Sequence, residues 1–437
     1  MSLDASPYQG YLYAYPHKTA YRPLRPRPAL RDVWHGERRD ALFAYVHLPF
    51  CEMRCGFCNL FTKANPADDE VTAYLRQLRR EAEAVREAVG PARFAAGAIG
   101  GGTPTYLDPR DLEALLGLMS ELAGGERMPL SVETSPATAT PDRLAVLAGA
   151  GVARVSIGVQ SFLDAEAHAA GRPQRRAEVD AALSALRAAG FGVLNLDLIY
   201  GIAGQTPRTW QYSLDAALGW RPEEIYLYPL YVRPLTGLGR RRGLDLDDAA
   251  WDRQRMALYG QGRDVLRAAG YRQLSQRSFR RADVATPDAD YCCQDDGMVG
   301  LGCGARSYTT ALHYSFDYAV SVRGVRGVLA DYLRQPATDL AYAHVGYTLD
   351  ETEQRIRWLV KTLLRADGCE RSAWQRRFGT ALDDDMPALS ALADRGWLVD
   401  DPEAVRLTDD GLAHGDAIGS FLISPAVRAA MRGYALR

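Results

Sequence analysis

The chain has 437 residues, of which 47% are hydrophobic and 24% are charged, and its 52 Lys and Arg residues nearly balance its 54 Asp and Glu residues. This composition predicts a globular protein of two to three domains and argues against a disordered or fibrous chain. The net charge of −2 provides no global basic field for nucleic acid, and no stretch reaches the roughly 18 apolar residues of a transmembrane helix, so we expect neither nucleic acid nor membrane as a partner.

Residues 1–40 are rich in tyrosine, proline and arginine and show neither helical nor strand periodicity. They lack the pattern of a signal peptide, so we expect a cytoplasmic protein. Because aromatic side chains at this density are rarely left in water, we expect an N-terminal arm that wraps another part of the molecule. His17 and Lys18 in this arm are candidates for recognising an anionic substrate or for closing over a site, although ordinary surface contacts are the simpler explanation.

A regular alternation of strands and helices begins at about residue 41. We expect strands at Leu42–Leu48, Phe94–Ile99, Leu130–Val132, Arg154–Val159, Val193–Ile199 and Glu224–Tyr228. We expect helices at Asp68–Val89, Pro109–Leu122, Pro141–Gly149, Ala177–Ala189 and Thr206–Leu218. Repeated β–α units require a parallel sheet, and six units without a dinucleotide-binding glycine motif favour an α/β fold with a partial (β/α)6 barrel. Chemistry in such barrels takes place on the loops that follow the strands.

The alternation loosens after residue 228, and from about residue 337 the pattern changes to helices followed by short apolar segments near residues 396–399 and 405–407. This order predicts a C-terminal winged-helix-like domain at 337–437, after a barrel with its extension at 41–336. Winged helices often bind DNA, but no basic stripe marks a recognition helix here. We therefore expect this domain to pack against the barrel or to cover a substrate.

Three of the seven cysteines follow the first expected strand directly, as Cys51, Cys55 and Cys58 in a C-x3-C-x2-C spacing. Three thiolates at this spacing can hold an iron–sulfur cluster and leave one iron without a protein ligand, which implies chemistry at that iron. The alternatives are a zinc site or three unrelated core cysteines. Zinc normally needs a fourth cysteine or histidine at pair spacing, and no second pair follows.

The cysteine loop after the first strand of a β/α barrel resembles that of radical S-adenosylmethionine (SAM) enzymes. The preceding Tyr-Val-His-Leu-Pro-Phe at 45–50 is similar to the HemN-like subgroup, the relatives of oxygen-independent coproporphyrinogen III oxidase. The resemblance implies a [4Fe–4S] cluster on Cys51, Cys55 and Cys58, with SAM bound to its open iron. It also implies reductive cleavage of SAM to a 5′-deoxyadenosyl radical, with electrons from a flavodoxin- or ferredoxin-type donor.

The same resemblance implies which residues contact SAM. The predicted set is Tyr45, Phe57, Gly101, Gly102, Thr103, Glu133, Gln160, Arg172, Asp197, Tyr228 and Tyr231. The glycines at 100–102 could equally form a tight turn, Arg172 could form a surface salt bridge, and the two last tyrosines could pack in the core. Asp197 lies in an otherwise apolar strand, where an unpaired carboxylate is costly, so we expect it to meet a ligand or a neighbouring donor.

Two features depart from the best-known branches of the subgroup. Leu60 stands where the porphyrinogen-decarboxylating members carry a fourth cysteine, and residues 291–297 lack the pattern typical of the haem-chaperone branch. The resemblance then favours the HemN-like methyltransferases and cyclopropanases of specialised metabolism, which use a second SAM as carbon donor to an unsaturated or aromatic small molecule. In that reading Gln294 contacts the second SAM.

Cys292 and Cys293 are candidates for donating a proton or hydrogen atom in such a reaction, although most free cysteines are simply small buried hydrophobes. The alternatives to carbon transfer are radical oxidation of a tetrapyrrole and a non-catalytic haem-trafficking role. Haem would call for a presented axial ligand, and the seven histidines form no tract. The sequence makes no prediction of the substrate's identity or of the oligomeric state.

Overall fold

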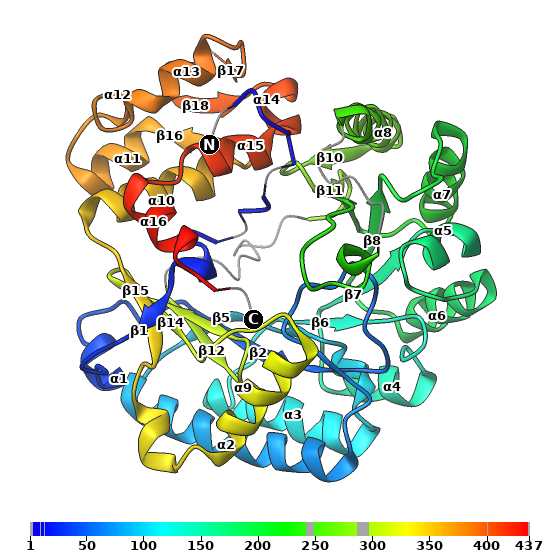
Figure 1. The fold of residues 1–437 in the computed structure, drawn as a ribbon. Coiled ribbons are helices and arrows are strands. Elements are labelled where there is room, and N and C mark those ends of the chain that lie inside the picture. Colours follow the sequence, from blue (N-terminus) through cyan, green and yellow to red (C-terminus); the bar gives the residue numbers. More distant parts are fainter. Residues whose placement is uncertain are drawn as a thin grey trace.

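The computed structural model describes residues 3–8, 10–12, 14–241, 249–285, 297–399 and 401–435. Its centre is a 13-stranded sheet in the order β1-β15-β14-β13-β12-β2-β5-β6-β7-β8-β9-β11-β10. The strands from β12 to β9 pair in parallel and curve into an open barrel (Figure 1). These strands are β2 (Leu42–Leu48), β5 (Phe94–Gly101), β6 (Leu130–Thr134), β7 (Arg154–Gln160), β8 (Val193–Tyr200), β9 (Glu224–Pro229) and β12 (Met298–Leu301).

The expected α/β partial barrel is therefore confirmed, and each of the six expected strands is present with ends within two residues of the prediction. The sheet is larger than expected, because antiparallel strands extend it at both edges. These added strands are β1 (Arg22–Pro23), β10 (Tyr271–Gln273), β11 (Ser278–Arg281), β13 (Arg306–Tyr308), β14 (Leu312–Ser315) and β15 (Val345–Thr348).

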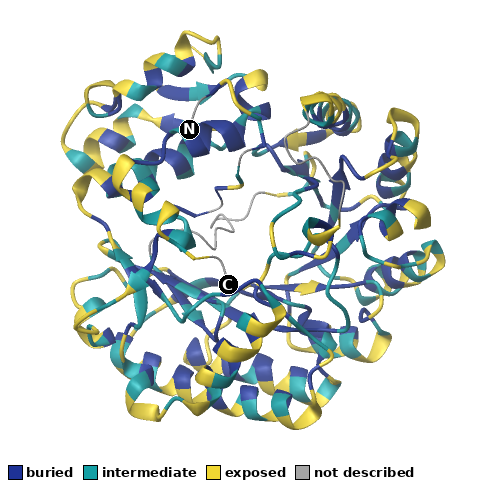
Figure 2. Ribbon diagram, in the orientation of Figure 1, coloured by how far each residue is buried: buried dark blue, intermediate teal, exposed yellow. Residues whose placement is uncertain are grey.

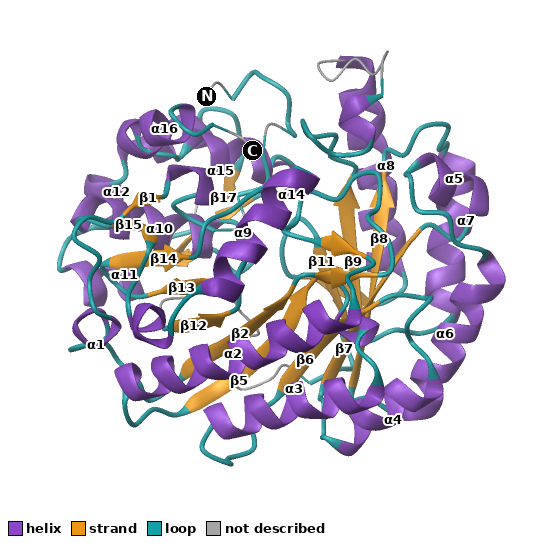
Figure 3. Cartoon of the chain, turned by 60° about the horizontal axis from the view of Figure 1, so that its bottom comes forward, coloured by secondary structure: helices purple, strands orange, loops and turns teal. Residues whose placement is uncertain are grey.

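Helices cover the outer face of the barrel (Figure 3). They are α2 (Asp68–Val89), α3 (Pro109–Leu122), α4 (Pro141–Gly149), α5 (Asp164–Ala169), α6 (Arg176–Ala189), α7 (Pro207–Gly219), α8 (Ala249–Ala268) and α9 (Val322–Arg334). Helix α2 shows why they pack this way, since Val71, Tyr74, Leu78 and Val85 recur at helical spacing and are buried. Figure 2 shows this division, with buried residues on the strands and exposed ones on the outer helix faces.

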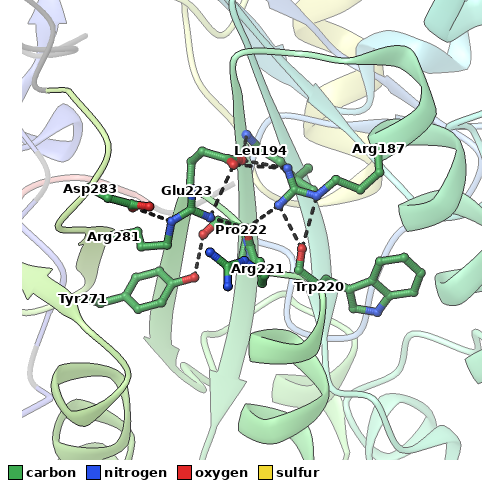
Figure 4. Close-up of polar contacts among 9 residues, drawn as sticks. All are labelled: Arg187, Leu194, Trp220, Arg221, Pro222, Glu223, Tyr271, Arg281 and Asp283. Carbon is green, nitrogen blue, oxygen red and sulfur yellow. Dashed lines mark hydrogen bonds and ion pairs between the residues drawn. The ribbon is translucent and has the colours of Figure 1, made fainter.

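Ion pairs and hydrogen bonds connect the amino-terminal ends of the barrel strands to the surrounding helices (Figure 4). Arg187 of α6 donates to a carboxylate oxygen of Glu223 at 2.9 Å and to the carbonyl of Trp220 at 2.9 Å. Glu223 also accepts the backbone N–H of Leu194 at 3.0 Å. These contacts fasten α6 to the starts of β8 and β9, so the opposite, carboxyl ends of the strands remain for a functional site.

The C-terminal region packs around a small sheet in the order β16-β18-β17. Its elements are α10 (Glu351–Leu363), β16 (Cys369–Glu370), α11 (Arg371–Phe378), α12 (Leu382–Asp385), α13 (Ser390–Ala393), β17 (Leu398–Val399), β18 (Ala404–Leu407), α14 (Asp409–Ala413), α15 (Gly415–Phe421) and α16 (Pro425–Arg432). A separate hydrophobic cluster holds these elements together and includes Leu12 and Tyr15 of the N-terminal segment. No described helix is long and apolar enough to cross a membrane.

The N-terminal segment contacts both the barrel and the C-terminal region, besides forming short helix α1 (Leu30–Val33). The Tyr8 hydroxyl donates to the sulfur of Met256 at 3.3 Å, and the Arg255 guanidinium lies 4.2 Å from the centre of the Tyr8 ring. The Tyr15 hydroxyl donates to the buried carboxylate of Glu353 in α10. In Figure 1 the blue segment accordingly crosses between the barrel and the red and orange helices.

Candidate functional site

The cysteine loop leaves the carboxyl end of β2 and is clasped by the loop that follows β5. The N–H of Gly102 donates to the carbonyl of Leu48 at 2.6 Å, and the N–H of Thr103 donates to that of Phe50 at 2.8 Å. A Cβ on Gly102 would collide with the Phe50 carbonyl oxygen, so this close approach requires glycine. The glycine run therefore packs directly against the cysteine loop in addition to forming a turn.

Each of the three cysteine sulfurs has a polar neighbour. The Thr103 hydroxyl donates to Cys51 Sγ at 3.6 Å, Arg172 Nη1 donates to Cys55 Sγ at 3.8 Å, and Cys58 Sγ lies 3.6 Å from the Thr62 hydroxyl. Arg172 therefore lies against the cysteine loop and not in a surface salt bridge. None of these three cysteines forms a disulfide.

Burial raises the pKa of the Cys51 thiol to about 12 and raises that of Cys55, and the neighbouring cysteine charges act in the same direction. Thiolates gathered in such a place need a cationic partner, which the irons of a cluster supply. The cysteine loop fits a cluster.

Gly56, between the second and third cysteines, holds the tip of the loop in place and was missed by the sequence reasoning. Its N–H donates to the carbonyl of Gly171 at 3.0 Å, and its carbonyl accepts the N–H of Leu238 at 2.7 Å. A Cβ on Gly56 would lie 2.8 Å from the carbonyl oxygen of Ala170. A glycine inside a ligand loop is the signal that could have indicated this contact.

Two carboxylates lie on strands β6 and β8 of the barrel, which are separated by β7. Glu133 of β6 accepts the N–H of Gly101 at 3.3 Å, and Asp197 of β8 accepts from Asn195 Nδ2 at 2.7 Å. Burial raises the pKa of Glu133 to about 7, aided by the charge of Asp197, and burial raises the pKa of Asp197 to about 6. The Glu133 side chain is open to water within the barrel, yet protein surrounds it and weakens its solvation. Two destabilised carboxylates in one chamber suit a ligand that brings positive charge and hydroxyl donors.

Gln160 and Arg172 meet over Gly158. A Cβ on Gly158 would lie 2.6 Å from Gln160 Nε2 and 3.3 Å from Arg172 Nη1, so both side chains cross the bare glycine. Gln160 itself has a φ of 67°, where a non-glycine residue is strained, and β7 is irregular between these two positions. Strain of this kind is concentrated at functional sites, and here it turns the Gln160 side chain across the strand.

The four predicted aromatic contacts lie in different settings. Tyr45 on β2 has its hydroxyl 3.4 Å from Nδ1 of His47, and Phe57 and Tyr228 both pack against the same small apolar cluster. Tyr231 donates its hydroxyl to Asp416 and accepts from Arg277 at 2.5 Å. The hydroxyl of Tyr231 is thus committed to a buried ion pair with the C-terminal region. The predicted residues Cys292, Cys293 and Gln294 lie outside the described residues.

His47 is a further residue of the site that sequence reasoning did not single out. Its ring is pressed between two glycines, since a Cβ on Gly101 would lie 2.5 Å from it and a Cβ on Gly304 would lie 2.6 Å from it. Burial lowers its pKa to about 4, so the ring is neutral, and its Nε2 lies 2.8 Å from the carbonyl of Phe61. A histidine in a buried strand, four residues before the first cysteine, was the available signal.

Comparison with known proteins identifies this arrangement. The family model of the radical SAM superfamily matches residues 45–217. The mitochondrial radical S-adenosyl methionine domain-containing protein 1 of Bos taurus is 30% identical over 70% of this chain and 69% of its own length. The chain belongs to the radical SAM superfamily.

Within the superfamily the matches fall in the HemN-like subgroup. The heme chaperone HemW of Bacillus subtilis is 27% identical over 87% of this chain and 98% of its own length. The coproporphyrinogen III oxidase HemN of Escherichia coli superposes with a TM-score of 0.74 at 22% identity, covering 93% of both chains. The cofactors of this radical SAM protein are accordingly a [4Fe–4S] cluster and SAM.

These relatives correct one prediction. Carbon transfer to an unsaturated small molecule, by methylation or cyclopropanation, was wrong, since the relatives that match along most of the chain are named as heme chaperones or as oxygen-independent coproporphyrinogen III oxidases. The error came from treating Leu60 and residues 291–297 as departures from every tetrapyrrole branch. A missing fourth cysteine bears on decarboxylation alone and says nothing against binding of a tetrapyrrole.

Proposed function

We propose that this radical SAM protein binds a tetrapyrrole at the open end of its barrel and serves in haem trafficking. The observation that carries the proposal is Leu60 on the cluster loop, at the position where the decarboxylating members have a fourth cysteine. The matches to heme chaperones, which span nearly the whole length of those relatives, support it. Leu60 is 46% exposed, so the loop presents an apolar side chain to a ligand at its rim.

The residues of the barrel have separate tasks in this proposal. Cys51, Cys55 and Cys58 hold the cluster, and Glu133 and Asp197 face the positively charged end and the hydroxyl groups of SAM. When bound and reduced by one electron, the cluster supplies the electron that cleaves the sulfonium bond of SAM. A flavodoxin- or ferredoxin-type protein is the proposed donor, and a tetrapyrrole is the proposed small-molecule partner.

Radical oxidation of a tetrapyrrole is the second candidate, and a specific observation favours it. The barrel retains two carboxylates with raised pKa values beside the cysteine loop, as the binding of a reactive cofactor requires. In this candidate the two carboxylates position SAM for a reaction with the bound tetrapyrrole. The two candidates therefore share the tetrapyrrole and differ in whether SAM is consumed together with it.

One experiment separates the candidates. Anaerobically reconstituted protein is mixed with haem or, in a parallel sample, with a reduced tetrapyrrole, passed through gel filtration, and then reduced in the presence of SAM. Trafficking predicts haem retained with the protein and unchanged in structure after SAM cleavage. Oxidation predicts 5′-deoxyadenosine formed in step with loss of hydrogen from a reduced tetrapyrrole. Protein that binds neither haem nor a reduced tetrapyrrole contradicts both.

A further inference from the structure

A cavity of about 320 Å³ lies beside the cysteine loop, outside the residues assigned to the cluster and to SAM. Its walls come from three distant parts of the chain, namely the N-terminal segment around Lys18, the β12–β14 region and the C-terminal end near Tyr434. The volume is at the lower end of that of ligand pockets, so it suits one edge of a large ring and not the whole of it.

The cavity directly adjoins the cluster loop. The hydroxyl of Tyr318, a lining residue, donates to the carbonyl of Asn59 at 2.5 Å, and Asn59 follows Cys58 in the chain. On another wall, a Cβ on Gly304 would lie 2.6 Å from the His47 ring, at the end of the strand that leads into the loop. A ligand in this cavity would therefore reach the edge of the cluster site.

Positive charge dominates the lining. Three basic residues, Lys18, Arg22 and Arg306, line the cavity, whereas Asp317 is the one acidic residue among its described lining residues. The Lys18 ammonium lies 3.6 Å from the centre of the Tyr318 ring, which leaves it a desolvated cation over an aromatic face. Burial lowers the pKa of Lys18 well below its usual value, and the charge of Arg306 acts in the same direction. The excess of basic side chains makes the cavity more favourable for an anionic ligand than for a cationic one.

The aromatic walls indicate what carries the anion. Tyr318 and Tyr434 flank the basic groups, and the Tyr434 hydroxyl donates to the carbonyl of Tyr318 at 2.8 Å, which fixes the two residues together. Basic groups set among aromatic rings match a flat conjugated ring with acid substituents. Arg22 is already bonded to backbone carbonyls of Tyr21 and Ala430, so it contributes its charge from a fixed position.

We infer that this cavity is the subsite for the carboxylate side chains of the ligand, with Lys18 and Arg306 as the residues that bind them. The inference rests on the proposed function, since it assigns a tetrapyrrole's acid groups to this place. It also gives the N-terminal segment a role in ligand selection, because that segment supplies Lys18 to the cavity.

The test uses metal-free deuteroporphyrin IX and its dimethyl ester, so that no axial ligand contributes to binding. Both are titrated by fluorescence into the cluster-containing wild-type protein and into Lys18→Met, Arg306→Gln and Arg326→Gln. Arg326 is exposed on α9 and does not line the cavity, so it is the matched control. Cluster absorbance and thermal unfolding of each variant show whether it is folded.

We expect the diacid to bind wild type and the control at least tenfold more tightly than the ester does. Lys18→Met and Arg306→Gln should each weaken the diacid about tenfold and leave the ester unchanged. Equal binding of diacid and ester by wild type, or equal weakening of both by the variants, would overturn the subsite while leaving the proposed function intact. If neither compound binds wild type, the proposed function fails, and the subsite fails with it.

Discussion

The barrel interior and the neighbouring cavity carry opposite charges. The interior presents Glu133 and Asp197, whose pKa values burial raises to about 7 and about 6, whereas the cavity presents Lys18, whose pKa burial lowers. Each region is thus unfavourable for its own charges and favourable for a ligand of the opposite sign. The difference indicates a cationic cofactor inside the barrel and an anionic ligand at its rim, with the cysteine loop between them.

The largest effect is expected from substitutions in the cysteine loop, which lies between the two regions. Cys51→Ala, Cys55→Ala or Cys58→Ala should each abolish reductive SAM cleavage and lower iron content after anaerobic reconstitution, because the loop has no spare thiolate. Iron analysis and 5′-deoxyadenosine formation measure this. Cys369→Ala is the control, since Cys369 is buried in the C-terminal cluster. Normal iron and cleavage in Cys55→Ala would show that the loop was assigned wrongly.

The next effect tests the acidic region alone. Asp197→Asn should weaken SAM binding by roughly ten- to a hundredfold while the cluster remains assembled, since a charge-assisted hydrogen bond is worth about 1.5–3 kcal/mol. Equilibrium dialysis with the reconstituted protein measures the affinity. Asp215→Asn on the exposed face of α7 is the matched control. Unchanged affinity in Asp197→Asn would place this carboxylate in the structure of the barrel and not at the cofactor.

A smaller effect follows from pH. As pH rises through about 6 and 7, Asp197 and Glu133 become charged, so affinity for the cationic cofactor should rise several-fold between about pH 5.5 and pH 8. In the ligand-free protein the two carboxylates have the opposite effect on folding stability, which falls as pH rises. Both pKa values are raised above their unfolded values, so their contribution to stability is full below about pH 4 and is lost as pH rises through 6 to 7. Asp197→Asn should flatten the pH dependence of both SAM affinity and stability. Unaltered pH dependence would contradict the placement of Asp197 with Glu133 in one chamber.

The smallest effect concerns the docking of the N-terminal segment that brings Lys18 to the cavity. Tyr15→Phe removes a hydroxyl that donates a hydrogen bond to the Glu353 carboxylate, which also accepts one from Ser424. The substitution should destabilise the protein by about 1–2 kcal/mol. Thermal unfolding measures this, with the exposed Tyr342→Phe as control. A variant as stable as the control would mean that other contacts dock the segment.

The sequence was most informative where local pattern decides structure. The strand Leu42–Leu48 and the helix Asp68–Val89 were predicted to the residue, because apolar periodicity and flanking breakers define them. The carboxylates of β6 and β8 follow from the same pattern, since the carboxyl ends of all parallel strands in a barrel face the same side. The acidic region was therefore within reach of sequence reasoning.

The basic cavity was not predicted as a site. It joins Lys18, Arg306 and Tyr434, each of which lies more than 100 positions from the next, and these residues follow no common period. Arg306 begins β13, which pairs with β12, and β12 in turn pairs in parallel with β2, about 250 positions earlier in the chain. The loosened alternation after residue 228 did not indicate this sheet contact. Proximity of this kind comes from tertiary pairing, so only His17 and Lys18 could be named beforehand, as an open alternative.

The separation of charges is tested most directly by cross-titration of two variants. SAM and deuteroporphyrin IX are each titrated into cluster-containing Asp197→Asn and Lys18→Met. The account predicts that Asp197→Asn loses affinity for SAM and keeps its affinity for the porphyrin, while Lys18→Met does the reverse. Equal loss of both ligands in either variant, or loss of neither, would contradict a cationic cofactor in the barrel with an anionic ligand at its rim.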